Sequence, residues 1–229
     1  MSEKLAYFLG VLLGDGSVGS GQRPTICLVG DLVEERGFYD YVLIPLIRRL
    51  FKISPYNYVR KGKSAYAVHF KSRRLVEYLL SELDFPVGEV RKHLPSSIML
   101  FPEGIRLAFI RGLFDSDGSM VFSRKTYGAY KYPTIEIKTV SYRLGLSVKQ
   151  VLVTAGFRTS LNRWAESWVV RTNGKKMLEL WMNKIGSHNV KHLTKYPVWK
   201  KAGFCPPKTT VLGRMRILKN WDLTHEDLT

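Results

Sequence analysis

The sequence contains only two cysteines, Cys27 and Cys205, which lie far apart and belong to no cysteine motif. This excludes a disulfide framework and a zinc knuckle, and we expect a reducing compartment. No apolar run approaches the roughly 18 residues of a membrane-spanning helix, so we expect no membrane partner. The N-terminal segment lacks a convincing signal-peptide cleavage site. We therefore predict an intracellular protein, either in a prokaryotic cytoplasm or in an organelle.

Histidine is also scarce, with five residues in the chain. His188 and His192 have the i,i+4 spacing that can place two imidazoles on one helix face, but no general-base glutamate lies between them. We interpret this pair as polar helix residues rather than as a zinc site.

Acidic residues are few: 19 Asp and Glu stand against 36 Lys and Arg, which gives a formal net charge of +17. An excess of this size destabilises the compact state by self-repulsion, and its usual purpose is to bind a polyanion. The hydrophobic fraction of 45% and the aromatic fraction of 12% argue against disorder. Nucleic acid is therefore the leading candidate partner.

One short pattern occurs twice, at residues 8–16 and 110–118. Each copy is an apolar stretch of helical length with small residues four positions apart. Small residues at this spacing line one face of a helix and let two backbones approach closely. We predict that the two stretches form helices that pack on each other through Gly10, Gly14, Gly112 and Ser116.

Each copy ends in an aspartate followed by a glycine, Asp15-Gly16 and Asp117-Gly118. We expect each glycine to close its helix in the left-handed conformation. The aspartate then lies at the negative end of the helix dipole, where its charge is disfavoured. If the helices pack together, the two carboxylates meet, which is costly unless a cation binds between them. Two matched copies favour metal binding over two unrelated turn residues.

The segments that follow the two motifs also repeat. Each half reads helix, strand, strand, helix, strand, strand, helix, which predicts an α+β fold. The strand at 24–28 matches that at 133–137, the helix at 32–51 matches that at 144–155, the strands at 56–60 and 64–70 match those at 158–164 and 167–171, and the helix at 73–79 matches that at 175–181. We predict two halves, 1–98 and 99–204, and a C-terminal extension, 205–229, that has no counterpart.

The paired motifs, their separation and the repeated element order resemble the LAGLIDADG homing endonucleases in their single-chain form. The resemblance covers residues 5–204. It implies two pseudo-symmetric αββαββα halves, with the motif helices at the centre and two saddle-shaped antiparallel sheets over the DNA major groove. It also implies a monomeric, intron-encoded or freestanding nuclease that cuts a long asymmetric DNA site and leaves short 3′ overhangs.

The resemblance further implies two or more Mg²⁺ ions, with Mn²⁺ as a substitute and Ca²⁺ supporting binding without efficient cleavage. By motif position, Asp15 and Asp117 are the catalytic metal ligands, one for each strand, and the backbone carbonyls of Gly14 and Ser116 offer further ligands. The sixth motif position, Leu13 in one copy and Asp115 in the other, is not a ligand position in this family.

A basic residue near each scissile phosphate is also implied. Lys92 fits this role in the first half because it lies shortly before Pro95. In the second half the spacing to a proline favours Lys195, and the repeated Lys-His-Leu sequence gives Lys191 as the alternative.

Strand alternation predicts which residues face the DNA, since neighbours of buried residues point to the opposite side of a sheet. We expect contacts from the free strand faces and from the basic hairpin tips, namely Arg23, Thr25, Cys27, Arg60, Lys61, Lys63, Arg124, Lys125, Lys131, Thr134, Glu136, Lys138, Arg158, Asn162, Arg163 and Arg171. We interpret the aromatic residues Tyr56, Tyr58, Tyr66, Trp164 and Trp168 as packing residues rather than base-stacking platforms.

Two other functions are compatible with the same residues. The first is an RNA maturase that assists splicing by binding intron RNA. The second is a DNA-binding regulator that does not cleave. Intact Asp15 and Asp117 favour the endonuclease.

Overall fold

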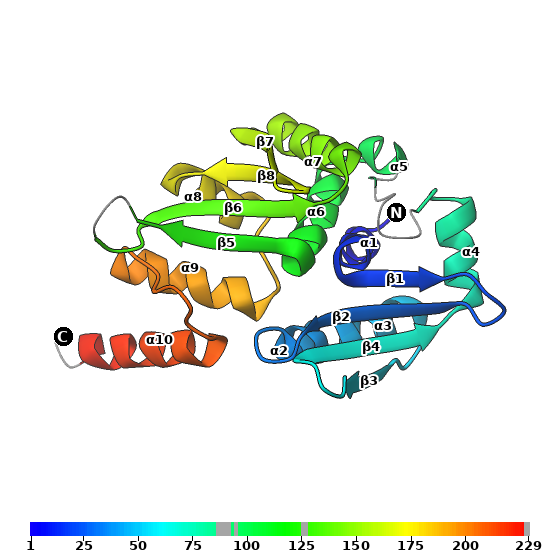
Figure 1. Ribbon diagram of the computed structural model, residues 1–229, viewed down its shortest axis with the longest axis horizontal. Helices are drawn as coiled ribbons and strands as arrows, with labels where there is room; N and C mark the ends of the chain where they lie inside the picture. The colour runs from blue at the N-terminus through cyan, green and yellow to red at the C-terminus, as the bar shows by residue number, and fades with distance from the viewer. Residues whose placement is uncertain (86–92, 94–95, 125–127, 227–229) are drawn as a thin grey trace.

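The computed structural model describes residues 1–85, 93, 96–124 and 128–226. Two four-stranded antiparallel sheets lie on opposite sides of a central pair of helices (Figure 1). The strand orders are β1-β2-β4-β3 in one sheet and β5-β6-β8-β7 in the other, so the same topology occurs twice. This confirms the predicted α+β class with two similar halves.

The first half follows the predicted order of elements. Its elements are α1 (Glu3–Asp15), β1 (Gly16–Gly19), β2 (Thr25–Asp31), α2 (Arg36–Phe38), the π-helical turn η1 (Tyr39–Leu43), α3 (Ile44–Phe51), β3 (Tyr56–Val59), β4 (Ala65–Lys71) and α4 (Arg73–Ser81).

The second half repeats this order after the short helix α5 (Ser96–Met99). Its elements are α6 (Glu103–Asp117), β5 (Gly118–Ser123), β6 (Tyr132–Thr139), α7 (Tyr142–Thr154), β7 (Thr159–Trp164), β8 (Ser167–Asn173) and α8 (Lys175–Lys184), followed by α9 (Val190–Ala202) and α10 (Val211–Glu226).

The helix expected at 32–51 differs in two ways from the prediction. It begins later, because the Asp31 carboxylate accepts hydrogen bonds at 2.8 Å from the backbone N–H groups of Val33 and Glu34 and holds a turn there. It also contains the π-helical turn η1, which ends two residues before Pro45. Because proline has no N–H to donate, the regular i→i−4 ladder cannot continue through this position.

The alternation expected in the strands is present on both sheets. Ile26 and Leu28 are buried on β2, and Ile135 and Ile137 are buried on β6. Their neighbours on each strand are more exposed and form the free face of the sheet. Within the described ranges, no helix is both long enough and apolar enough to cross a membrane.

Helices α1 and α6 pack so closely that glycine is required at their crossing. A Cβ atom at Gly10 would lie 2.8 Å from the backbone nitrogen of Leu113, and one at Gly112 would lie 2.9 Å from that of Val11. Gly14 faces Ser116 in the same way. The small residues of the two motifs therefore meet each other across the helix pair.

Gly16 and Gly118 do not adopt the left-handed conformation that we predicted. Their φ angles are −96° and −85°, because strands β1 and β5 begin directly at these residues. Glycine is needed at both positions because a side chain would not fit. A Cβ atom at Gly118 would lie 2.7 Å from the Cα atom of Phe114, and Gly16 packs against Leu12 in the same way. This tight return places each preceding aspartate between the end of its helix and the start of a sheet.

Gly112→Ala is expected to lower the free energy of unfolding by about 3 kcal/mol, since the new methyl group meets backbone that cannot move aside. Gly213→Ala on α10 is the matched control. Its Cβ atom would lie 3.5 Å from its nearest neighbour, so this variant is expected to be neutral or slightly stabilised. Urea unfolding measures both. A wild-type midpoint for Gly112→Ala would contradict the close crossing.

Candidate active site

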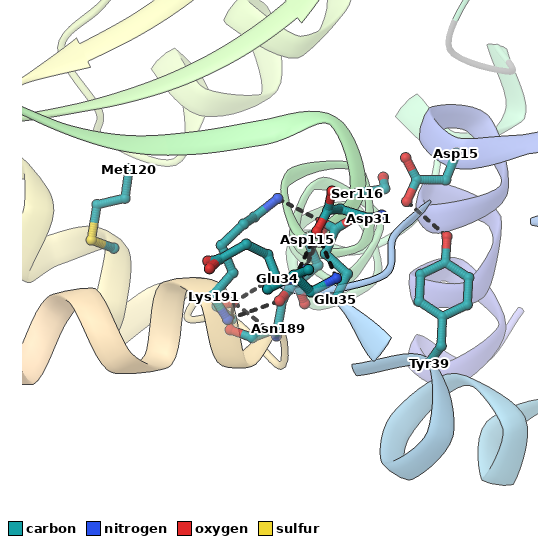
Figure 2. A network of polar contacts seen from close by, with 12 residues as sticks. Asp15, Asp31, Glu34, Glu35, Tyr39, Asp115, Ser116, Met120, Asn189 and Lys191 are labelled. Carbon is teal, nitrogen blue, oxygen red and sulfur yellow. Dashed lines mark hydrogen bonds and ion pairs between the residues drawn. The ribbon is translucent and has the colours of Figure 1, made fainter. Parts of the chain in front are cut away.

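Asp15 ends α1 and lies partly buried beside Tyr39 (Figure 2). The Tyr39 hydroxyl, from the π-helical turn, donates a hydrogen bond of 3.0 Å to the Asp15 carboxylate. Burial raises the pKa of Asp15 well above its usual range, and the charges of Glu35 and Asp117 raise it further. The Tyr39 hydrogen bond and the charge of Lys191 oppose this shift. Three carboxylates and one lysine therefore interact at the end of α1.

Asp117 occupies the equivalent position at the end of α6, and its side chain is exposed. The two motif aspartates thus lie in different surroundings, although they follow the same close helix crossing. The backbone nitrogen of Asp117 would lie 3.3 Å from a Cβ atom at Gly14, so the ends of the two motifs are adjacent.

Glu35 is a site residue that the sequence analysis missed. It is 6% exposed and precedes α2. Its carboxylate accepts hydrogen bonds from the Lys191 ammonium at 2.6 Å and from the Asn189 amide at 3.2 Å (Figure 2). Glu35 belongs to the first half, whereas Asn189 and Lys191 belong to the second. Glu35 therefore joins the two halves beside Asp15, and a lone glutamate in a turn gives no sequence signal of this role.

Asp115, at the sixth motif position, is fully buried. Its carboxylate accepts hydrogen bonds of 2.8 Å from the Tyr7 hydroxyl and from the backbone N–H of His188, and another from the Ser187 hydroxyl. Burial raises its pKa to about 6, although these hydrogen bonds favour the charged form. The Asn189 amide also donates to the backbone carbonyl of Asp115 at 2.7 Å. Asp115 thus holds in place the segment from which Asn189 and Lys191 reach Glu35.

The two candidate lysines of the second half lie on α9 with different partners. Lys191 forms the ion pair with Glu35, and its positive charge lowers the pKa of Asp15. The Lys195 ammonium donates to the backbone carbonyl of Met120 at 3.1 Å, and burial followed by the charges of Arg214 and Lys191 lowers its pKa. Lys92 lies outside the described residues.

The possible metal ligands near the motifs are oxygen atoms. In the part of the chain that the structure describes, no three His, Cys, Asp or Glu side chains form a group that could hold a metal ion. Mg²⁺ is usually bound by one or two carboxylates together with substrate phosphates and water, and Asp15 and Asp117 fit this pattern. His192 is fully buried with its ring 4.2 Å from that of Phe114, whereas His188 contacts Arg111.

The free face of the second sheet carries several of the expected DNA contacts. Glu136 lies between buried neighbours and accepts a hydrogen bond of 2.6 Å from Arg171 on the adjacent strand. Thr134, Lys138 and Asn162 lie on the same face by strand register. Arg163 alternates with Asn162 and therefore lies on the opposite face, close to the turn between β7 and β8.

The free face of the first sheet carries Thr25 and Cys27, and Cys27 pairs with His69 in register. The remaining basic candidates are on or beside the hairpin turns and loops, where Arg60 is partly buried and the others are exposed: Arg23, Arg60, Lys61, Lys63, Arg124, Lys131 and Arg158. Lys125 lies outside the described residues.

Two of the aromatic residues that were interpreted as packing residues are largely exposed. Tyr66 is buried, but Tyr56 is 61% exposed and Trp164 is 62% exposed. Both lie on outer strands, β3 and β7, where only one neighbouring strand covers them. The Tyr56 ring lies 5.1 Å from that of His69, and the Arg171 guanidinium lies 5.6 Å from that of Trp164. Each free face therefore presents an aromatic side chain.

Comparison with known proteins agrees with this architecture. Residues 104–191 match a family model described as a LAGLIDADG-like domain. An uncharacterized protein of Methanocaldococcus jannaschii is 30% identical over 138 residues, which cover 58% of this chain and 48% of that protein. The chain thus spans about half the length of this relative.

Solved structures share the fold across both halves. Mesophilic variants of the homing endonuclease I-DmoI superpose with a TM-score of 0.58 at 18% identity, covering 80% of this chain and 95% of that one. The N-terminal LAGLIDADG domain of WhiA gives a TM-score of 0.55 at 16% identity, covering 80% of this chain and 81% of that one. The second half thus matches a LAGLIDADG-like domain, and the chain shares the fold of these solved LAGLIDADG structures across both halves.

Proposed function

We propose that the chain is a metal-dependent endonuclease that binds a long asymmetric DNA site as a monomer and cuts both strands. One observation carries the proposal: Asp15 and Asp117 end two tightly crossed helices, and burial, Glu35 and Asp117 together raise the pKa of Asp15. A cation would offset this crowding of negative charge. The net charge of +17 supports a polyanionic substrate.

The oxygen donors suit Mg²⁺, for which Asp15 and Asp117 would serve as ligands together with the backbone carbonyls of Gly14 and Ser116. When bound, the metal lowers the pKa of an attacking water and stabilises charge on the scissile phosphate. Structures of I-DmoI with DNA have been solved with Mn and with Ca, which supports the use of a divalent ion by this fold. The two aspartates would serve opposite strands, since duplex cleavage needs one hydrolysis on each.

Lys191 is the better candidate for the basic residue of the second half. Its charge acts on Asp15, and the ion pair with Glu35 fixes its ammonium group at the junction of the halves. Because its ammonium group is already held there, Lys191 would neutralise phosphate charge without the entropic cost of ordering a free lysine side chain. Lys92 remains the proposal for the first half.

The free faces of the sheets would read the DNA. Arg171 can donate to guanine and Glu136 can accept from cytosine in the major groove. In the free protein they pair with each other, so DNA binding would exchange this ion pair for contacts to the bases. The exposed rings of Tyr56 and Trp164 would add apolar contacts, and the basic hairpin tips would bind phosphates.

The proposal is tested by incubating the protein with a randomised duplex library in Mg²⁺, Ca²⁺ or EDTA and sequencing the cut ends. We expect cuts at one long site with short 3′ overhangs in Mg²⁺, and binding without efficient cleavage in Ca²⁺. Binding without any cleavage in Mg²⁺ or Mn²⁺ would instead indicate a regulator that does not cut. Binding to structured intron RNA alone would indicate a maturase.

A further inference from the structure

The C-terminal extension closes a pocket of about 380 Å³ beside the free edge of β5. One wall is the β5 edge at Met120–Phe122, a second is α9 with Lys191 and Lys195, and a third is the turn Pro206–Thr209. Strand β5 begins directly after Asp117, so this pocket lies close to the proposed active site. Figure 1 places α9 alongside β5 and α10 next to α9.

Arg214 fixes the extension in this position. It is 1% exposed and donates to the Glu34 carboxylate at 2.8 Å and to the Thr194 hydroxyl at 2.9 Å. Glu34 also accepts a hydrogen bond of 3.0 Å from the backbone N–H of Val211. The extension is thus attached to both halves, and its turn is held against Lys195.

Positive charge in the pocket exceeds negative charge. Of its four cationic side chains, Lys191 pairs with Glu35 and Arg214 pairs with Glu34. Within the described ranges, neither Lys195 nor Lys208 forms an ion pair. Lysine has three donors, and Lys195 gives one of them to the Met120 carbonyl. Burial and the neighbouring cations also lower the pKa of Lys195, and a bound anion would oppose this shift.

Lys208 occupies a position that favours glycine. Its φ angle is +56°, in the left-handed region that side chains with a Cβ atom rarely adopt. Its side chain is exposed at the pocket. Glycine adopts this φ angle without strain, so replacing Lys208 by glycine removes the charge without an expected loss of stability.

We propose that this pocket binds a backbone phosphate of duplex DNA through Lys195 and Lys208, which makes the extension part of the DNA-binding surface. The proposal rests on the proposed function, because it takes the substrate to be DNA. Both ammonium groups line one cavity, and the turn that carries Lys208 is anchored through Arg214. The contact is to phosphate and therefore carries no base specificity.

The test is Lys208→Gly, measured with a short random-sequence duplex in EDTA, so that cleavage plays no part. Each lost phosphate contact lowers the slope of log K against log salt by about 0.9, and affinity near 0.1 M salt is expected to fall about eightfold. Glycine suits the positive φ angle, so the variant is expected to unfold at or above the wild-type temperature. Lys208→Arg keeps the charge and is expected to keep the wild-type affinity and slope.

Lys176→Gln is the matched control, because Lys176 is exposed on α8, away from the pocket. A wild-type slope for Lys208→Gly would overturn the proposal. A loss of affinity for structured RNA with unchanged duplex binding would also overturn it, in favour of an RNA contact.

A second measurement, with inorganic phosphate as the ligand, tests the pocket without DNA. At matched ionic strength, phosphate is expected to raise the Tm of the wild type above its value in chloride, and Lys208→Gly is expected to lose this rise. If the wild-type protein binds no duplex, the proposed function fails while the phosphate measurement still tests the pocket. A phosphate effect without a change in the duplex slope would overturn the DNA assignment and leave a site for free phosphate.

Discussion

Replacement of Asp15 or Asp117 by asparagine is expected to reduce linearisation of a target plasmid by at least about 100-fold while DNA binding in Ca²⁺ survives. Asparagine keeps the shape and one oxygen of the side chain but removes the charge that would hold a divalent cation. Single-turnover assays on supercoiled DNA separate nicked from linear product. Because the two aspartates would serve different strands, each variant is expected to accumulate nicked circles.

Stability distinguishes a metal ligand from a structural residue. Burial and the neighbouring carboxylates raise the pKa of Asp15, so ionisation of Asp15 costs stability as the pH rises from its ordinary range through the raised value. Asp15→Asn removes this cost and is therefore expected to be more stable than the wild type at neutral pH without metal. A catalytic defect that merely reflected unfolding would appear with the opposite change in stability.

Asp84→Asn provides the matched control for these variants. The Asp84 side chain is 85% exposed, and its φ angle of +47° is one that asparagine tolerates. This variant is expected to cleave like the wild type. Unchanged cleavage by both Asp15→Asn and Asp117→Asn would refute the metal assignment.

The helix pair and the strand faces were predictable because their signals are local. Small residues four positions apart place a groove on one helix face, and alternation along β2 and β6 separates a buried face from a free one. The conformation of Gly16 and Gly118 was not predictable in the same way. An Asp-Gly pair can end a helix in a left-handed turn or lead directly into a strand, and here the start of the sheet decides between them.

The contacts that complete the site come from residues distant in sequence. Glu35 and Lys191 are 156 positions apart, and no pattern in either segment indicates that they meet. The motif position of Asp115 indicates only that it is not a metal ligand, whereas its carboxylate binds Ser187 and His188, directly before the helix that carries Lys191. Lys191 and Lys195 are one helical turn apart on α9, so sequence spacing alone could not choose between them.

The extension had no counterpart in the repeat, and the buried cation Arg214 joins its last helix to both halves. The second large effect is therefore expected for Arg214→Met, with a loss of about 3–5 kcal/mol in the free energy of unfolding. Glu34 would lose its partner, and the hydroxyl of Thr194 would lose its donor. Arg216→Met on an exposed position of the same helix is expected to stay within about 0.5 kcal/mol of the wild type.

The double variant Arg214→Met with Glu34→Gln shows which interaction accounts for the lost free energy of unfolding. If much of the loss is the cost of an unpaired Glu34 carboxylate, the second substitution restores part of the stability. If α10 instead detaches as a unit, urea unfolding of Arg214→Met shows a smaller slope, since less surface is then exposed on unfolding. Detachment would also free the turn that carries Lys208, and the salt dependence of DNA binding would fall to that of Lys208→Gly. A wild-type unfolding curve for Arg214→Met would show that Arg214 does not hold the extension.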